Sequence, residues 1–302
     1  MNRNATFTIL TALVLTAVSC SSGDKGYDAT GTFEATEVTV SAEQNGRLVT
    51  FTPEEGQTLR AGQQVGLIDT VQLWLKARQA GATRQVYADQ RPDTQKQMAT
   101  LRQQLAKARQ EQARFEALVR DNAANSKQLD DARSAVQVLQ RQLDALAAQL
   151  GNSTKSLNSQ MSAAEIQREA VLDQLRKCHV QSPIAGMVIE KYAEQGEFAA
   201  VGKPLFKVAD VQRMYLRAYV TTSQLQSVKI GQQVRVFADY GGGNRREYQG
   251  TVSWISARSE FTPKTILTDD ERADLVYAVK IAVKNDGYIK IGMYGEVKLQ
   301  EK

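Results

Sequence analysis

Two stretches of the sequence carry residue types that perform chemistry in other proteins. Cys178 and His179 are adjacent, and a thiol beside an imidazole could act as a nucleophile with its base or as two metal ligands. Adjacent side chains point in different directions, however, and no third residue completes either arrangement. The glycine triplet at 241–243 lacks the following helix and the Lys-Ser or Lys-Thr pair of a phosphate-binding loop, so a hairpin turn is favoured. The sequence therefore predicts no enzyme activity, no catalytic or metal-binding residue and no cofactor.

A third reactive residue, Cys20, directly follows a predicted export signal. A single positive charge precedes an apolar-to-neutral run over 5–18, which is shorter than the roughly twenty residues of a membrane span and predicts a signal peptide at 1–19. Cys20 follows a small residue and resembles the lipidated cysteine of bacterial lipoproteins. That resemblance implies a lipid on Cys20, a tether over 20–30 and attachment to a bilayer. A plain secreted chain, cleaved near this point, is the alternative.

Charge is concentrated in the middle of a chain whose composition is otherwise typical of globular proteins. The formal net charge is +5, and residues 71–177 hold 17 Lys or Arg against 11 Asp or Glu. A nucleic-acid-binding surface would need interleaved aromatic residues or a known motif, and this segment has only three aromatic residues. We therefore interpret the excess as a solvated helical face and expect no nucleic-acid partner.

Residues 71–178 are predicted to form a helical hairpin, because apolar residues recur there at alternating steps of three and four, as in the a and d positions of a coiled coil. The segment 120–128, rich in Asp, Asn and Ser, supplies the stop and start signals of a helix-to-helix turn. Two helices joined by so short a loop must be antiparallel. The predicted contact positions, two of them polar, are Met98, Leu101, Leu105, Ala108, Gln112, Phe115, Val119, Leu129, Ala132, Val136, Leu139, Leu143, Leu146, Leu150, Leu157, Met161, Ala164, Arg168, Val171 and Leu175.

Each arm of the predicted hairpin has one interruption. Pro92 cannot occupy a helix interior without losing a hydrogen bond and clashing with the preceding turn. The run at 151–154, which begins with Gly151, consists of poor helix formers. The two interruptions lie at similar distances from the tip, so we expect them to face each other and to form a hinge.

The segments flanking the hairpin repeat a glycine pattern. Glycines at 46, 56 and 62 recur at 186, 196 and 202, each at an offset of 140 residues. Each half reads as short strands joined by glycine turns, and neither has enough apolar surface to fold alone. We expect residues 31–70 and 179–210 to complete one β-sandwich. The remaining segment, 211–302, reads as β-strands, so the predicted fold class is α+β, with a β-barrel after the sandwich.

These features resemble the HlyD-type membrane fusion proteins, the periplasmic adaptor subunits of tripartite exporters. The resemblance rests on the split lipoyl/biotinyl-like module, on the motif VQSPIAGMV at 180–188, and on the block at 260–283, which is similar to a stretch in adaptors of ABC-type exporters. It implies a barrel-sandwich hybrid, a periplasmic location with the lipid in the inner membrane, and a ring in which six copies are expected. The implied partners are an inner-membrane ABC permease and a TolC-like outer-membrane channel. An adaptor of a proton-driven resistance-nodulation pump is the alternative, and only the block at 260–283 argues against it.

The predicted hairpin tip resembles the pattern Arg-x3-Leu-x6-Ser, through which such adaptors meet the outer-membrane channel. Arg114 and Leu118 match, whereas Asn125 occupies the serine position and Ser126 follows it. The resemblance implies that these four residues contact the channel. Two other classes fit less well: a lipoyl-type carrier would need a lysine where the halves join, and a purely structural coiled-coil lipoprotein would leave the sandwich and barrel without purpose. We also expect the membrane-proximal domain of some relatives to be absent or vestigial.

Overall fold

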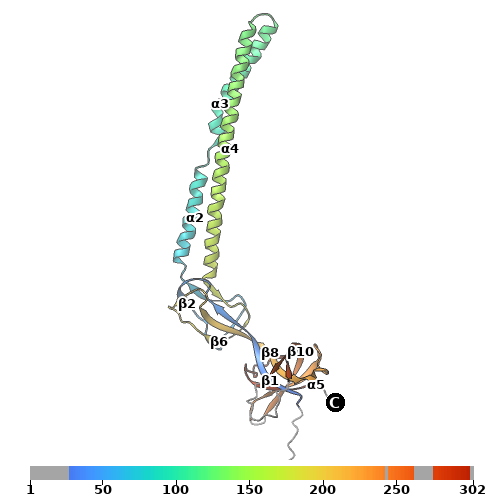
Figure 1. The fold of residues 1–302 in the computed structure, drawn as a ribbon. Helices are drawn as coiled ribbons and strands as arrows, with labels where there is room; N and C mark the ends of the chain where they lie inside the picture. Colours follow the sequence, from blue (N-terminus) through green and yellow to red (C-terminus); the bar gives the residue numbers. More distant parts are fainter. Residues whose placement is uncertain (1–26, 242–243, 262–274, 300–302) are drawn as a thin grey trace, which may run out of the picture.

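The computed structural model describes residues 27–241, 244–261 and 275–299. The predicted signal peptide, Cys20, most of the glycine triplet and much of the block at 260–283 lie outside these residues. The chain is elongated, with a helical hairpin at one end, a β-sandwich at its base and a β-barrel beyond the sandwich (Figure 1). This arrangement confirms the predicted fold class.

Three helices build the hairpin: α2 (Val71–Asp89), α3 (Thr94–Arg120) and α4 (Ser126–Lys177). α2 and α3 follow each other along one side of α4, which is continuous (Figure 1). All twenty predicted contact positions are buried or half-buried, so the predicted seam is confirmed. Cross-helix contacts keep one register along the rod, since Arg84 pairs with Glu165 at 3.2 Å and Glu116 with Arg133 at 3.5 Å, and the two residue numbers in each pair add to the same value.

The ascending arm is interrupted near Pro92. α2 ends at Asp89 and α3 begins at Thr94. Proline disfavours the helical conformation in the residue before it, and Asp93 then caps the new helix, its Oδ1 accepting a hydrogen bond from the Lys96 backbone N–H at 3.1 Å.

The predicted break at 151–154 is wrong, because α4 runs through it as part of a 52-residue helix. Gly151 costs about 1 kcal/mol relative to alanine in a helix. Ending the helix there would cost more, because a second helix would have to be nucleated and the apolar seam would lose contact. Thr154 takes the next contact position after Leu150, and Leu157 the one after that. The two consecutive four-residue steps, Leu146 to Leu150 to Thr154, form a stutter that locally unwinds the coiled coil without breaking the helix. The expectation that Gly151 forms half of a hinge therefore loses its basis.

The sandwich is assembled from both halves of the glycine repeat. The first half supplies β2 (Gly46–Phe51), β3 (Thr58–Leu59) and β4 (Gln64–Ile68). The second supplies β5 (His179–Gln181), β6 (Gly186–Lys191), β7 (Phe198–Ala199) and the start of β8 (Pro204–Thr221). β3 pairs with β6 and β2 with β7, so each half completes the sheet of the other. One apolar core is shared by the two halves.

The repeated glycines make the same contacts in each half. The Gly56 N–H donates to the Val188 carbonyl at 2.8 Å, and the Gly196 N–H donates to the Leu48 carbonyl at 2.8 Å, so donor and acceptor exchange halves at the same offset. Gly56 and Gly196 have φ of 84° and 95°, which glycine adopts without steric cost. The turns of one half are thus locked onto a strand of the other.

The barrel contains the remaining strands: β9 (Gln233–Asp239), β10 (Arg245–Phe261), β11 (Leu275–Lys284) and β12 (Tyr294–Lys298), with a short helix α5 (Thr222–Leu225). They lie in the order β12-β9-β10-β11-β8, and β1 (Ala29–Ser41) pairs with both β12 and β8 to close the barrel. The assignment of 31–35 to the sandwich is therefore wrong, because these residues complete the barrel. β1 passes into the sandwich only after a register shift between Ala35 and Thr36.

The boundary predicted at 210/211 lies inside β8, which serves both domains. Opposite the shift in β1, residues 211–213 of β8 have no partner in β1. Asp210 Oδ1 accepts hydrogen bonds from the Gln212 and Arg213 backbone N–H groups at 3.1 and 3.3 Å. The sandwich and barrel are thus joined by two paired strands with a bulge at the crossing.

Candidate functional site

The distal end of the hairpin is a tightly hydrogen-bonded turn. α3 ends at Arg120, and Asn122 adopts the left-handed conformation with φ of 56°. The Ala123 N–H donates to the Leu118 carbonyl at 2.8 Å, and the Asn122 N–H donates to the Val119 carbonyl at 3.1 Å. These two bonds form a Schellman motif, which satisfies the last carbonyl groups of the helix and fixes the direction of the loop.

Asn125 begins the descending helix rather than projecting freely. Its Oδ1 accepts a hydrogen bond from the Lys127 N–H at 3.0 Å, while Gln128 Oε1 accepts one from the Asn125 N–H at 3.4 Å. The Asn125 side chain also accepts from the Gln128 backbone N–H, so Asn125 and Gln128 form a capping box. Ser126 is the first helical residue, and its hydroxyl lies 3.4 Å from Asn125 Oδ1. The substitution of asparagine at the expected serine position therefore leaves a good N-cap.

Arg114 and Leu118 lie on the last two turns of α3. The Arg114 guanidinium is exposed, lies 3.7 Å from the Glu111 carboxylate and sits 5.4 Å from the centre of the Phe115 ring. Leu118 is half-buried, and its carbonyl belongs to the turn described above. The structure thus gathers the four predicted contact residues at the distal end, with Arg114 and Leu118 on the last two turns of α3 and Asn125 and Ser126 at the start of α4.

An ion pair between the two helices, Glu116 with Arg133, lies near this end of the hairpin. A hydrogen bond from Gln112 and the nearby Arg133 lower the pKa of the Glu116 carboxyl. Glu116 and Arg133 lie 3.5 Å apart, so this exposed ion pair joins the two helices below the tip. Asn122 is among the stop signals predicted for the turn, and asparagine is one of the few residues other than glycine that favours the left-handed conformation. The prediction did not single out Gln128, although the spacing Asn-x-x-Gln could have signalled the capping box.

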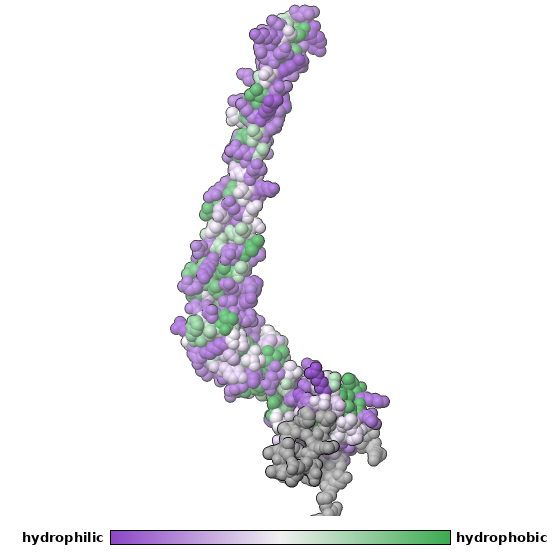
Figure 2. All heavy atoms as spheres, viewed as in Figure 1, coloured by the Kyte–Doolittle hydropathy of each residue, from purple (hydrophilic) through white to green (hydrophobic). Residues whose placement is uncertain are grey.

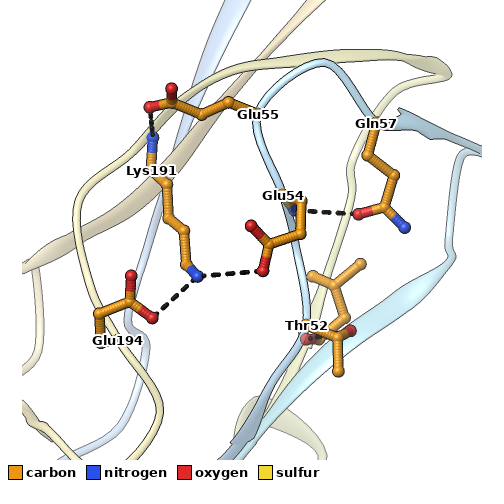
Figure 3. A network of polar contacts seen from close by, with 7 residues as sticks. Thr52, Glu54, Glu55, Gln57, Lys191 and Glu194 are labelled. Carbon is orange, nitrogen blue, oxygen red and sulfur yellow. Dashed lines mark hydrogen bonds and ion pairs between the residues drawn. The ribbon is translucent and has the colours of Figure 1, made fainter.

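A polar network at the other end of the hairpin joins the two sandwich halves. Lys191 Nζ lies 2.8 Å from Glu194 and 3.4 Å from Glu54, and its backbone N–H donates to Glu55 at 3.2 Å (Figure 3). The Lys191 side chain is 12% exposed and passes within 5.9 Å of the Phe51 ring centre. The hydrogen bond to Glu194 raises the pKa of Lys191, with Glu54 adding to the effect. This lysine is held inside an ion-pair network, so it is not presented as the lysine of a carrier domain would be.

The Cys178 and His179 side chains point to different partners. The Cys178 thiol is buried, with Sγ 3.4 Å from the Gln174 carbonyl, and burial raises its pKa, which lowers the fraction of reactive thiolate. His179 Nδ1 lies 3.0 Å from Gln64 Oε1. Within residues 27–241, 244–261 and 275–299, no three His, Cys, Asp or Glu side chains gather as metal ligands would. None of the helices in those ranges is both long and apolar enough to cross a membrane.

A sandwich completed by two separated halves, with a coiled-coil hairpin inserted and a barrel attached, defines the class of membrane fusion proteins. The family described as "RND MFP, barrel-sandwich hybrid domain" matches residues 36–211, and the chain belongs to this family. It is therefore a periplasmic adaptor of the kind that serves efflux, which confirms the coarser part of the prediction.

Several known proteins share the sequence pattern or the fold of this chain. A UPF0194 membrane protein of Yersinia pseudotuberculosis is 28% identical over 285 residues, covering 85% of this chain and 84% of its own. A second, from Yersinia enterocolitica, is 28% identical over 334 residues and covers 97% of each chain. MacA from Actinobacillus actinomycetemcomitans shares the fold with a TM-score of 0.54 at 21% identity, over 89% of this chain and 76% of that one. A membrane fusion protein from Streptococcus pneumoniae gives 0.55 at 16% identity, over 90% and 98%.

Proposed function

We propose that this protein is a lipid-anchored adaptor that links an inner-membrane ABC-type exporter to a TolC-like outer-membrane channel. The observation that carries the proposal is the hairpin: α4 alone has 52 residues, about 78 Å at 1.5 Å per residue, and it begins at a hydrogen-bonded turn remote from the sandwich. On the face shown in Figure 2, hydrophilic side chains predominate toward the tip of this rod, and apolar side chains are interspersed nearer the sandwich. A rod that buries so little of itself serves to reach a partner.

The two ends of the molecule have different proposed roles. Arg114, Leu118, Asn125 and Ser126 contact the outer-membrane channel, supported by their common position at the distal end. The barrel lies at the opposite end, where the described chain begins at Tyr27, seven residues after Cys20 in the sequence (Figure 1). The adaptor is of the HlyD type and forms a ring, with six copies expected. No catalytic step is assigned to it, and the energy for export comes from the transporter.

An adaptor of a proton-driven resistance-nodulation pump is the second candidate. The description of the matched family names RND, which favours this alternative. The block at 260–283 favours the ABC-type partner, because it is similar to a stretch in adaptors of those exporters. The partner that co-purifies decides between the two.

Pull-down of the tagged, membrane-extracted protein is expected to recover an ABC permease and an outer-membrane channel. Recovery of one very large proton-driven permease in place of the ABC permease would select the second candidate, and recovery of no transporter and no channel would refute the adaptor proposal. The Cys20→Ser variant is expected to lose membrane association. A Cys20→Ser protein that remained membrane-bound would contradict the lipid anchor.

A companion pair of variants separates the tip from the rest of the rod. Arg114→Ala/Leu118→Ala is expected to lose the channel while retaining the permease. Arg78→Ala/Val86→Ala makes a comparable change on α2, far from the tip, and is expected to retain both partners. Equal losses in the two doubles would contradict a specific tip contact.

The hinge is now proposed at Pro92 alone, because only the ascending arm is interrupted. Spin labels at Thr83 and Thr100, exposed residues on either side of the break, are expected to show a broad distance distribution. Pro92→Ala/Asp93→Ala removes the break and the cap, so α2 and α3 should join and the distribution should narrow.

Gly151→Ala is the control for this hinge. A Cβ at Gly151 would meet no atom within 4 Å, so the substitution should stabilise α4 by about 1 kcal/mol and leave the measured distribution unchanged. If Gly151→Ala narrowed the distribution, or the Pro92 double did not, the proposed hinge would be contradicted.

A further inference from the structure

The positive charge of the protein is concentrated at one level of the hairpin. We define the basic belt as residues 94–109 of α3 and 140–155 of α4, which face each other in the register set by the cross-helix pairs. The belt holds six cations against one carboxylate, Asp144, so its net charge equals the +5 of the whole chain. All six cations are exposed. They are Lys96, Arg102, Lys107, Arg109, Arg141 and Lys155.

The levels above and below the belt are different. The tip level, 110–139, has four cations and five carboxylates, and the base level, 71–93 with 156–177, has seven and five. These levels hold cross-helix and same-helix ion pairs, among them Arg84 with Glu165 and Asp173 with Lys177. An exposed helical rod usually mixes its charges in this way. The belt therefore departs from the rule that the rest of the hairpin follows.

Cations of the belt are left largely without acidic partners. Within the described part of the chain, only Lys96 has an ion pair, with Asp93 at the belt's edge at 3.3 Å. Arg109 donates to the neutral Gln140 at 2.7 Å, and Asp144 accepts from the same glutamine rather than from a cation. Six cations lie along about 24 Å of rod, an average axial spacing of about 4 Å. This spacing is shorter than the screening length of about 8 Å at physiological salt, so the cations act together on a charged partner.

The shape and chemistry of the belt restrict that partner. Arg102 and Arg109 are one heptad apart beside the seam, whereas Lys96 and Arg141 occupy positions opposite it, so the charge surrounds the rod. A surface of this kind fits an extended polymer rather than a small ion. The belt has no aromatic residue to stack on bases and no continuous apolar face to enter a bilayer, but it has seven glutamines, whose amides hydrogen-bond to sugars and peptides.

We propose that the basic belt binds an extended, carboxylate-bearing polymer outside the protein, the chemistry presented by the peptide-cross-linked glycan of the bacterial cell wall. The choice of the cell wall rests on the proposed function, which places the rod in the periplasm between two membranes. In a ring of parallel hairpins the belts of neighbouring copies lie at the same level, so their like charges add. A polyanion neutralises that repulsion and fixes the rod where it crosses the wall.

The test is co-sedimentation of the full protein with purified peptidoglycan sacculi. Lys107→Gln/Arg141→Gln/Lys155→Gln removes three belt cations that make no ion pair, so folding should be retained. This triple variant is expected to bind about tenfold more weakly or worse. Added salt should weaken the wild type, and sacculi whose carboxylates have been amidated should not bind.

The matched control removes the same charge elsewhere on the hairpin. Lys76→Gln/Arg120→Gln/Lys127→Gln is expected to bind within about twofold of the wild type. Equal losses in the two triples, unchanged binding to amidated sacculi, or no binding to sacculi would overturn the proposal. It would also be overturned if vesicles of phosphatidylglycerol and phosphatidylcholine bound the belt in preference to sacculi. Because the assay needs no transporter, a failed pull-down beside belt-dependent sedimentation would count against the proposed partners only, and the reverse against the belt only.

Discussion

Gly186→Ala is expected to destabilise the β-sandwich by about 3 kcal/mol. A Cβ at this position would lie 2.3 Å from the Ala209 carbonyl oxygen and 2.7 Å from its carbon, and neither can move without shifting β8. Ala209 and the adjacent Val208 are fully buried. The glycine is needed because two backbones approach closely, since its φ lies outside the left-handed region.

Gly46 is the matched control, because it occupies the equivalent position in the other half of the repeat. A Cβ there would meet the Ile68 Cγ2 methyl at 2.7 Å, but the nearest backbone atoms are at 3.6 Å. A side chain can yield where a carbonyl group cannot, so Gly46→Ala is expected to cost about 1 kcal/mol.

Hydrogen exchange of the sandwich strands, followed by mass spectrometry, measures both costs in the intact protein. Relative to the wild type, exchange in β6 and β8 of Gly186→Ala is expected to accelerate more than exchange in β2 and β4 of Gly46→Ala. Equal acceleration in the two variants would mean that an added Cβ costs the same at both positions. The close approach of Gly186 to Ala209 would then not explain why glycine is needed there.

Features encoded by local spacing could be predicted from the sequence. All twenty positions placed by the alternation of three and four are buried or half-buried, because the seam depends only on which residues share a helix face. Thr154 and the buried Ala77 and Ala80 of α2 were not among them. The common offset of the glycines predicted that two separated segments complete one sandwich. At the tip, the Asp, Asn and Ser residues predicted the turn, and Asn125 proved to be its N-cap.

Features that depend on distant partners could not be predicted. Gly151 and its neighbours are poor helix formers, yet the long seam on either side keeps them helical. Helix propensity describes single residues and does not include the packing of the flanking helix. β1 reads as one run of strand residues, and nothing within it marks Ala35 as the point where it leaves the barrel. That point is set by pairing with β8 and β12, which lie about 170 residues or more away in the chain.

Phe33→Ala is expected to destabilise the barrel by about 3–5 kcal/mol. The Phe33 ring is fully buried in the barrel core and lies over Gly295 of β12, where an added Cβ would meet ring atom Cε2 at 2.7 Å and Leu216 Cδ1 at 2.8 Å. Removing the ring leaves a cavity where β1 closes the barrel. Tyr294→Ala is the control, since that neighbouring side chain is 73% exposed, and it should cost less than about 1 kcal/mol.

The consequences of Phe33→Ala should stop at the bulge. Residues 36–41 of β1 pair with 204–210 of β8 in the sandwich, and the register shift after Ala35 separates this ladder from the one in the barrel. Exchange should therefore accelerate in β9 and β12, while β2 and β4 stay protected. Equal acceleration in the sandwich would show that the paired strands transmit unfolding between the domains. An adaptor whose barrel and sandwich open separately can keep its hairpin base intact while the barrel follows the transporter, and an adaptor whose domains unfold together cannot.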